Sequence, residues 1–358
     1  PTLEIYLVRA KASIQTGTLE LAVGDLTEVI LLDDEHAEAY RLRGNANFEL
    51  GDFSEAIEDL TEALKSDPEN IQLLLFRGDS YLELNQPGEA IKDFDTVLAL
   101  DPNNEEALRR SGRILVATAK YEEALEIYSS ILKANPDNTA ALVDRSLCYE
   151  KLGQLKLALD DLTRAMELDP TLTEKHKTKY AALHMQQGSE FLEDGKWEDA
   201  LENFKLAIQA DEGSRPDAEQ AMATAYLKRA LQLLEDEGPE VALADLNSCL
   251  QLRPEDQQAL RLRGGIHVQL GKYQEAIDDY DRLLELKPGD EQALFARGRS
   301  WNAMKQYEKA AGDFTSIITN PLTVNRDIAF IERARSQAAL NLFTEAIDDF
   351  KEAIRIEE

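Results

Sequence analysis

Residues 37–70 have the sequence AEAYRLRGNANFELGDFSEAIEDLTEALKSDPEN, and the rest of the chain repeats this pattern. Apolar residues in its first half recur at helical spacing, which places them on one face of an α-helix. Gly51 and Asp52 interrupt that pattern. A second amphipathic segment begins near Ser54, a candidate N-cap, and ends before Pro68, because the residue before a proline avoids the α region. The stretch therefore predicts two antiparallel helices joined by a tight turn.

An alanine recurs at the same place in ten copies of this pattern, mostly in steps of 34 residues. Each alanine precedes a large apolar residue by four positions, so that both lie on one helix face. We expect the alanine to mark the close approach of a neighbouring helix. A period of 20–50 residues indicates a solenoid of stacked units. The recurring residues are Ala22, Ala56, Ala90, Ala124, Ala158, Ala200, Ala242, Ala276, Ala310 and Ala346.

Three further features recur within the unit, whose places we number from its first residue, so that Ala37 is at place 1. They are a glycine at place 8 (Gly44, Gly78, Gly112, Gly188, Gly264, Gly298), an aromatic residue at place 17 (Phe53, Tyr121, Trp197, Tyr273, Tyr307, Phe343) and a closing proline (Pro68, Pro102, Pro136, Pro170, Pro254, Pro288). In these residues the chain resembles the tetratricopeptide repeat family over almost its whole length. The resemblance implies an all-α fold, a right-handed superhelical solenoid of about ten antiparallel helix pairs.

The repeats predict one continuous domain over residues 1–358. We place them at 3–36, 37–70, 71–104, 105–138, 139–172, 181–214, 223–256, 257–290, 291–323 and 327–358. The inserts 173–180 and 215–222 continue the helical pattern, so we expect them to lengthen the first helices of the sixth and seventh repeats by about two turns. Solenoids normally end in a polar capping element, whereas this sequence ends at Glu358, within the pattern of the last helix of the tenth repeat. We therefore expect this chain to be a segment of a longer protein.

Arginine at place 7 and aspartate at place 23 occur together in eight repeats and are missing together in the other two. This joint loss predicts a partly buried ion pair between the two helices of a repeat. Arginine suits the role because its planar fork meets a carboxylate at two points. The predicted pairs are Arg9–Asp25, Arg43–Asp59, Arg77–Asp93, Arg145–Asp161, Arg229–Asp245, Arg263–Asp279, Arg297–Asp313 and Arg333–Asp349.

The composition excludes several classes of partner. A net charge of −30 argues against nucleic acid, whose phosphates need a basic surface, and against an anionic membrane surface. No apolar run approaches the roughly 20 residues that span a bilayer, so we expect no membrane insertion. Cys148 and Cys249 lie at non-equivalent places and are interpreted as small buried thiols, which favours a reducing, cytoplasmic location.

No residue pattern points to catalysis, and we predict neither an enzyme activity nor a metal or cofactor. Adjacent carboxylates such as Asp278 and Asp279 point about 100° apart on a helix and do not converge on a substrate. The four histidines lack metal-type spacing, and no phosphate-binding glycine loop is present. Gly264-Gly265 is interpreted as a site of close helix packing.

The charge is divided unevenly between the helices. Places 1–14 of the ten repeats carry 18 basic and 17 acidic residues, whereas the rest of the chain carries 21 and 52. The family resemblance implies that first helices line a concave groove, through places 2, 5, 6, 9, 12 and 13. The candidate peptide-binding residues are Arg41, Asn45, Leu75, Phe76, Arg109, Arg110, Arg113, Val143, Leu147, Leu227, Lys228, Leu231, Arg261, Phe295, Arg299 and Arg335.

A carboxylate clamp, which some members of that family use on chaperone tails, is incomplete here. Its first repeat is matched by Arg41 and Asn45, but Phe76 stands where an asparagine belongs. In the next repeat, Glu106 and Arg110 stand where two bases belong. We therefore expect no such clamp.

The resemblance and the charge distribution together favour a non-catalytic scaffold that binds an extended protein segment or peptide, acidic or mixed acidic and apolar, in the groove. Two alternatives stay open. The chain is the recognition or regulatory arm of an enzyme whose catalytic domain lies outside it, or it is a chaperone-like binder of unfolded chains. The last alternative predicts loose sequence preference and little dependence on salt.

Overall fold

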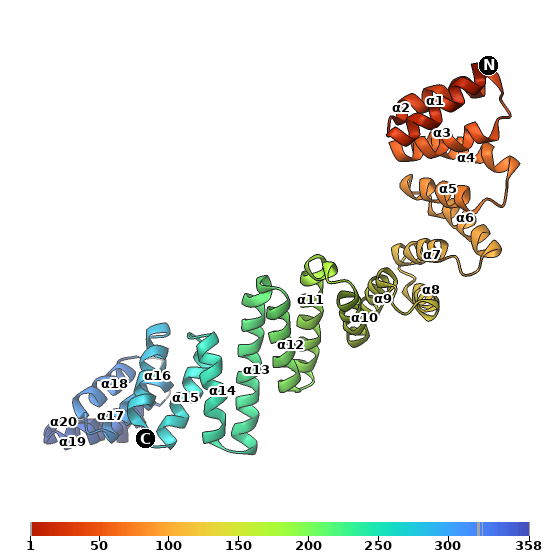
Figure 1. The fold of residues 1–358 in the computed structure, drawn as a ribbon. Coiled ribbons are helices and arrows are strands. Elements are labelled where there is room, and N and C mark those ends of the chain that lie inside the picture. The colour runs from red at the N-terminus through yellow and green to blue at the C-terminus, as the bar shows by residue number, and fades with distance from the viewer. Residues whose placement is uncertain (1, 321–322, 324, 358) are drawn as a thin grey trace. The chain divides into compact units, whose positions relative to one another are not determined.

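The computed structural model describes residues 2–320, 323 and 325–357, over which the chain forms twenty α-helices, one short 3-10 helix and no strand (Figure 1). It divides into two compact units, Pro1–His176 (unit 1) and Lys177–Glu358 (unit 2). Helices alternate as first and second members of a repeat, which confirms the all-α helix-pair fold. In unit 1, the second helices α2, α4, α6 and α8 each pack against the first helices before and after them.

The helix bounds agree with the predicted repeats. The five pairs before the first insert are α1 (Thr2–Thr16) with α2 (Leu19–Leu32), α3 (Ala37–Leu50) with α4 (Phe53–Ser66), α5 (Ile71–Glu83) with α6 (Pro87–Leu100), α7 (Glu105–Ala117) with α8 (Tyr121–Ala134), and α9 (Thr139–Lys151) with α10 (Leu155–Leu168). The others are α11 (Thr171–Glu193) with α12 (Trp197–Ala210), α13 (Arg215–Asp236) with α14 (Pro239–Leu252), α15 (Gln257–Gln269) with α16 (Tyr273–Leu286), α17 (Glu291–Ala303) with α18 (Tyr307–Thr319), and α19 (Arg326–Ala339) with α20 (Phe343–Glu357). The 3-10 helix η1 (Glu212–Ser214) precedes α13.

Both inserts lengthen first helices as predicted. Helix α11 has 23 residues and α13 has 22, whereas the other first helices have 13 to 15. The predicted N-cap Ser54 is wrong, because α4 begins one residue earlier and its cap position is Asp52. Gly51, with φ +85°, reverses the chain so tightly that the second helix starts two residues later.

The core of each repeat lies between its two helices, where small residues face large ones. All ten recurring alanines are buried. A Cβ atom on Gly78 would lie 2.5 Å from the Phe94 ring, so place 8 must be glycine where a buried aromatic ring fills place 24. The fifth repeat has a smaller leucine at place 24, Leu162, and there place 8 is Ser146. Rings at this place are the largest fully buried side chains: Tyr128, Phe94, Phe204 and Phe314.

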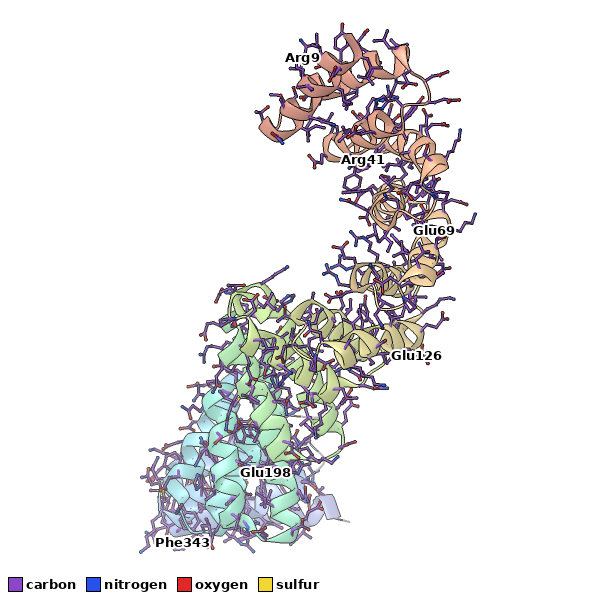
Figure 2. The ribbon with its side chains drawn as sticks, turned by 45° about the vertical axis from the view of Figure 1, so that its right-hand side comes forward. Arg9, Arg41, Glu69, Glu126, Glu198 and Phe343 are labelled. Atoms are coloured by element: carbon purple, nitrogen blue, oxygen red, sulfur yellow. The ribbon has the colours of Figure 1, made fainter. Side chains whose placement is uncertain are left out.

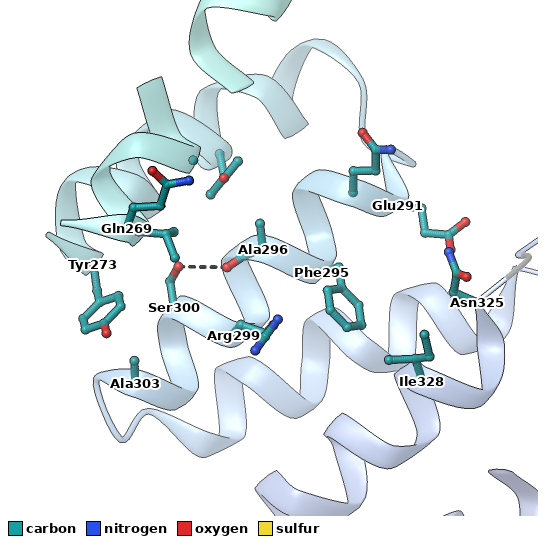
Figure 3. A pocket seen from close by; sticks show the side chains of 14 residues that line it. Gln269, Tyr273, Glu291, Phe295, Ala296, Arg299, Ser300, Ala303, Asn325 and Ile328 are labelled. Carbon is teal, nitrogen blue, oxygen red and sulfur yellow. Dashed lines mark hydrogen bonds between the residues drawn. The ribbon is translucent and has the colours of Figure 1, made fainter. Parts of the chain in front are cut away.

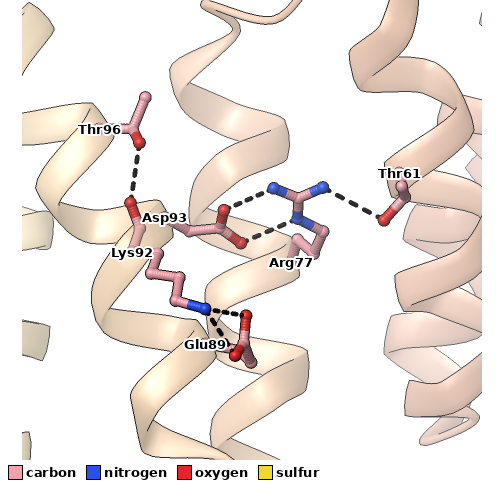
Figure 4. A network of polar contacts seen from close by, with 6 residues as sticks. All are labelled: Thr61, Arg77, Glu89, Lys92, Asp93 and Thr96. Atoms are coloured by element: carbon pink, nitrogen blue, oxygen red, sulfur yellow. Dashed lines mark hydrogen bonds and ion pairs between the residues drawn. The ribbon is translucent and has the colours of Figure 1, made fainter.

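All eight predicted Arg–Asp pairs are confirmed, and each guanidinium donates at least two hydrogen bonds to its carboxylate, at 2.5–3.2 Å. The aspartates are 3–7% exposed. Figure 4 shows Arg77 between Asp93 and Thr61, which belongs to the preceding repeat. This third contact, at 3.2 Å for Arg77, was not predicted. Six other arginines also contact the preceding repeat, through Thr27, Ser129, Glu198, Asn247, Asp281 and Thr315, so the arginine also joins neighbouring repeats.

The sixth repeat replaces the ion pair by a neutral one. His184 Nδ1 lies 2.8 Å from Asn203 Oδ1, and both side chains are buried. The two cysteines are buried, as predicted. Carboxylates on second helices and in turns, such as Glu69, Glu126 and Glu198, lie on the surface (Figure 2). No helix within the described residues is both long and apolar enough to cross a membrane.

Candidate functional site

Unit 2 contains a pocket of about 670 Å³ that spans three successive repeats (Figure 3). First helices α15, α17 and α19 form its walls, and two tyrosines from α16 complete it. Most of its lining residues occupy the places predicted to face a groove. They are Gly265, Val268, Gln269, Tyr273, Tyr280, Glu291, Gln292, Phe295, Ala296, Arg299, Ser300, Ala303, Asn325 and Ile328. We call this the unit 2 pocket.

Small residues make the unit 2 pocket hollow. Gly265, Ala296 and Ala303 stand where larger side chains would fill the space, and Phe295 and Ile328 supply apolar walls. The Ser300 hydroxyl donates to the carbonyl of Ala296 at 2.8 Å, as Figure 3 shows, so it is already occupied. Such a hollow suits an apolar side chain of a ligand.

Charged groups of both signs stand around this hollow. Arg299 and Arg335 are each 64% exposed, and they share Glu332, whose Oε1 lies 4.0 Å from Arg299 and 3.0 Å from Arg335. The guanidinium of Arg299 also lies 6.0 Å from the centroid of Phe295. Since two arginines share one carboxylate, this wall keeps a net positive charge. On another wall Glu291 accepts a hydrogen bond from Asn325 at 3.5 Å.

Unit 1 contains a smaller pocket, of about 370 Å³, on α3, α5 and α7. All of its lining residues stand at predicted groove places: Phe48, Asp79, Leu82, Glu83, Glu106, Arg109, Arg110 and Arg113. We call this the unit 1 pocket. The three arginines of the fourth repeat that were predicted as groove residues therefore do meet at one site.

Carboxylates of the chain itself neutralise those three arginines. Arg110 donates two hydrogen bonds to Asp79, at 2.7 and 2.9 Å, and a third to Glu106 at 3.1 Å. Arg109 and Arg113 lie 3.9 and 3.5 Å from Asp144. An acidic ligand would have to compete with these carboxylates, so the unit 1 pocket has less positive charge to offer than its arginine count implied.

The other candidate residues of unit 1 lie outside its pocket. Arg41 is 3.7 Å from Glu38, and Phe76 makes an edge-to-face contact with the pocket residue Phe48, with ring centroids 5.3 Å apart. Asn45, Val143 and Leu147 are half-buried. Leu75 is 8% exposed and belongs to the core, so it offers a ligand little surface.

In unit 2, only Phe295 and Arg299 of the candidate residues line the pocket. Arg261 is tied to Asp290 at 2.7 Å. Lys228 is exposed and Leu231 half-buried, whereas Leu227 is 9% exposed and packs in the core. Arg335 does not line the pocket, but it contacts Glu332, which also contacts the lining residue Arg299.

Two pocket residues, Tyr273 and Tyr280, were missed because the prediction considered only first helices. The pair Gly264-Gly265 could have indicated Tyr280, since two adjacent glycines leave the side chains of the neighbouring second helix uncovered. Gly264 is closely packed, as predicted: its Cβ would lie 2.9 Å from Cζ of Tyr280. Gly265 is not, because its Cβ would be 3.8 Å from the Tyr280 hydroxyl. Among the described residues, no group of three or more His, Cys, Asp or Glu side chains is arranged to hold a metal ion.

Comparisons with known proteins agree on the repeat. Family models described as tetratricopeptide repeat match residues 7–71, 47–107, 81–144, 139–172 and 227–300. Among curated proteins, the chain is similar to the DnaJ homolog subfamily C member 7 homolog of Schizosaccharomyces pombe, with 30% identity over 142 residues. That match covers 38% of this chain and 29% of the length of that protein.

Solved structures of similar fold include MamA, 21% identical, which matches 50% of this chain and 95% of its own with a TM-score of 0.44. YrrB, described as a TPR protein with an unusual peptide-binding site, is 25% identical over 46% of this chain and 85% of its own, with a TM-score of 0.42. A tetratricopeptide repeat protein from Parabacteroides merdae is 16% identical and covers 97% of this chain and 99% of its own, with a TM-score of 0.41.

Proposed function

Because the chain belongs to the tetratricopeptide repeat family, we propose that it is a non-catalytic protein-interaction scaffold that binds an extended peptide along its first helices. One observation supports this above all. The unit 2 pocket is built by three successive first helices, with an exposed arginine beside an aromatic wall and small residues at its centre. An extended segment that crosses successive repeats would meet all three.

The walls of this pocket favour a peptide of mixed character. Phe295 and Ile328 favour an apolar side chain, and Arg299 with Arg335 favours a carboxylate nearby, because they share the single carboxylate of Glu332. Buried aromatic and arginine residues are also the ones that most often dominate binding energy at interfaces. We therefore infer that unit 2, rather than the arginine cluster of unit 1, contains the main binding site.

Peptide binding at two salt concentrations tests this proposal. A library of extended acidic–apolar peptides is measured against the wild type, Phe295→Ala, Arg299→Ala and the triple variant of Arg109, Arg110 and Arg113 to alanine. We expect the two unit 2 substitutions to weaken binding, and high salt to do the same, because exposed charges are screened. Arg355→Ala is the matched control, as Arg355 is an exposed arginine paired with Glu352 on α20.

Either of two results would overturn the assignment. Loss of binding in the triple variant with none in the unit 2 variants would move the site to the unit 1 pocket. Absence of any peptide binding would remove the scaffold proposal in this form and favour the alternative that the chain is the recognition arm of an enzyme.

A co-chaperone-like role is the second candidate, and the similarity to a DnaJ homolog favours it. It predicts binding of many unrelated apolar peptides with little dependence on salt, and no loss in Arg299→Ala. The same two-salt experiment therefore separates the two candidates. For either one we propose a cytoplasmic location, which the burial of both cysteines supports.

A further inference from the structure

Two tyrosines occupy place 24 of their repeats, Tyr128 in unit 1 and Tyr280 in unit 2. Each ring lies beneath the glycine at place 8. A Cβ on Gly112 would be 2.8 Å from Cζ of Tyr128, and one on Gly264 would be 2.9 Å from Cζ of Tyr280. The glycine therefore lets each ring reach through the first helix toward the side on which the pockets lie.

The residue at place 9, directly after the glycine, decides whether the tyrosine hydroxyl is covered or faces the pocket. In unit 1 it is Arg113, which lines the unit 1 pocket, while the Tyr128 hydroxyl is buried and has no hydrogen-bond partner within the described part of the chain. In unit 2 it is Gly265, and Tyr280 itself lines the unit 2 pocket. The missing side chain at place 9 leaves the hydroxyl of Tyr280 facing the cavity.

Packing alone does not require this hydroxyl. Repeats three, six and nine carry phenylalanine at place 24, and Phe94, Phe204 and Phe314 are fully buried beneath their own glycines. Tyr280 is only 4% exposed, yet it brings a polar group to a pocket that Phe295, Ala296 and Ile328 line with apolar side chains. A ligand that fills the pocket would bury this hydroxyl, and burial of a polar group without a partner is unfavourable, so the ligand has to supply one.

We propose that Tyr280 is a specificity-determining residue, whose hydroxyl donates a hydrogen bond, through the opening at Gly265, to an acceptor oxygen of the bound peptide. This inference rests on the peptide-binding function proposed above. The acceptor is a carboxylate, amide or carbonyl oxygen, from a side chain of the peptide or from its main chain.

The hydroxyl is suited to act as this donor. Burial raises the pKa of Tyr280 to about 12, so the group keeps its proton throughout the physiological range. Nothing in the described chain accepts a hydrogen bond from it, which leaves the proton available. A peptide that lacks an acceptor at this point would bury the hydroxyl unpaired, so the site discriminates against purely apolar side chains.

Three substitutions test the inference on the tightest peptide from the library. Tyr280→Phe keeps the ring that repeats three, six and nine bury at place 24, and it is expected to weaken binding roughly two- to tenfold. Gly265→Arg introduces the residue that unit 1 carries at this place, and it is expected to weaken binding about tenfold or more by covering the hydroxyl. Tyr128→Phe is the matched control, because its hydroxyl is buried in the other unit, and it is expected to leave affinity unchanged.

A double-mutant cycle identifies the source of the acceptor. If a peptide side chain accepts the bond, one substitution in the peptide, for example glutamate to leucine, abolishes the difference between wild type and Tyr280→Phe, whereas glutamate to glutamine preserves it. If a main-chain carbonyl accepts it, replacing the neighbouring amide by an ester reduces the difference and no side-chain substitution does.

The outcomes separate this inference from the function on which it rests. If Tyr280→Phe and Gly265→Arg both bind the peptide with wild-type affinity, the role of Tyr280 is overturned, but the proposed scaffold function is not. Absence of binding by the wild type overturns both. Equal losses in Tyr280→Phe and Tyr128→Phe would show a general effect on the fold and would also overturn the inference.

Discussion

The unit 1 pocket and the unit 2 pocket are built from the same places of three successive repeats, but they differ in how those places are filled. In unit 1, three arginines are matched by Asp79, Glu106 and Asp144. In unit 2, glycine and alanine leave the hollow open. The larger pocket of the two therefore occurs where the groove places carry small residues rather than a cluster of charged ones. Large charged side chains fill space, and those of opposite sign neutralise one another.

Removal of the Arg–Asp ion pair, which both units share, should destabilise the two units equally. This is the largest effect on stability that we expect. Asp93→Ala in unit 1 and Asp279→Ala in unit 2 each leave a mostly buried arginine without its carboxylate. We expect each to cost about 3 kcal/mol of unfolding free energy. Chemical denaturation measures it. A single transition that shifts in both variants would support one continuous domain over 1–358, whereas separate transitions, each shifted by one variant, would refute it.

The adjacent glycines of unit 2 should respond in opposite ways. Gly264→Ala places a Cβ 2.9 Å from Cζ of Tyr280 and is expected to destabilise the protein by about 1–3 kcal/mol, since the core must shift to accept it. Gly265→Ala has room at 3.8 Å and should be neutral or stabilising by up to about 1 kcal/mol, because alanine favours helix. Thermal unfolding compares them. In unit 1, Gly112→Ala should resemble Gly264→Ala, and a neutral result there would contradict the proposed packing.

Mild acid should weaken unit 2 through its two histidines. Burial lowers the pKa of both His184 and His267 from the usual 6.5. Because the folded state disfavours the protonated form of these histidines, they do not oppose folding while the pH is above their unfolded pKa. Below about pH 6.5 the unfolded chain binds protons more readily, and the free energy of unfolding falls. We expect the unfolding free energy of unit 2 to decline between pH 7.5 and 5.5. In the double variant His184→Gln, His267→Gln the decline should be smaller, and an unaltered pH profile would reject this cause.

The smallest expected effect concerns the turn between helices. Ala119 in unit 1 and Lys305 in unit 2 have φ angles of +58° and +61°, in a region that glycine adopts at no steric cost. Ala119→Gly and Lys305→Gly should each stabilise the protein by up to about 1 kcal/mol, despite the added freedom of the unfolded chain. The reverse change, Gly153→Ala at φ +71°, should destabilise it. Differential scanning calorimetry resolves these shifts.

Much of the fold could be predicted from the sequence because each repeat is a local structure. The helix pairs, the two lengthened first helices and all eight Arg–Asp pairs follow from spacings within about 34 residues. The same periodicity predicted residues that lie together, since all of those that line the unit 1 pocket stand at predicted groove places. Only the start of α4 was misplaced, because a residue in the left-handed region shortens the turn before it.

The sequence by itself therefore determined the fold, since its period states which residues of a repeat share a face and which pairs meet across the helices. The tertiary structure alone decided which groove residues are free to act. It showed that Asp79 and Asp144 approach the arginines from neighbouring repeats, and that Tyr280 reaches the unit 2 pocket from a second helix. Charge compensation and cavity volume depend on distances between side chains of different repeats, and no spacing along one chain records those distances.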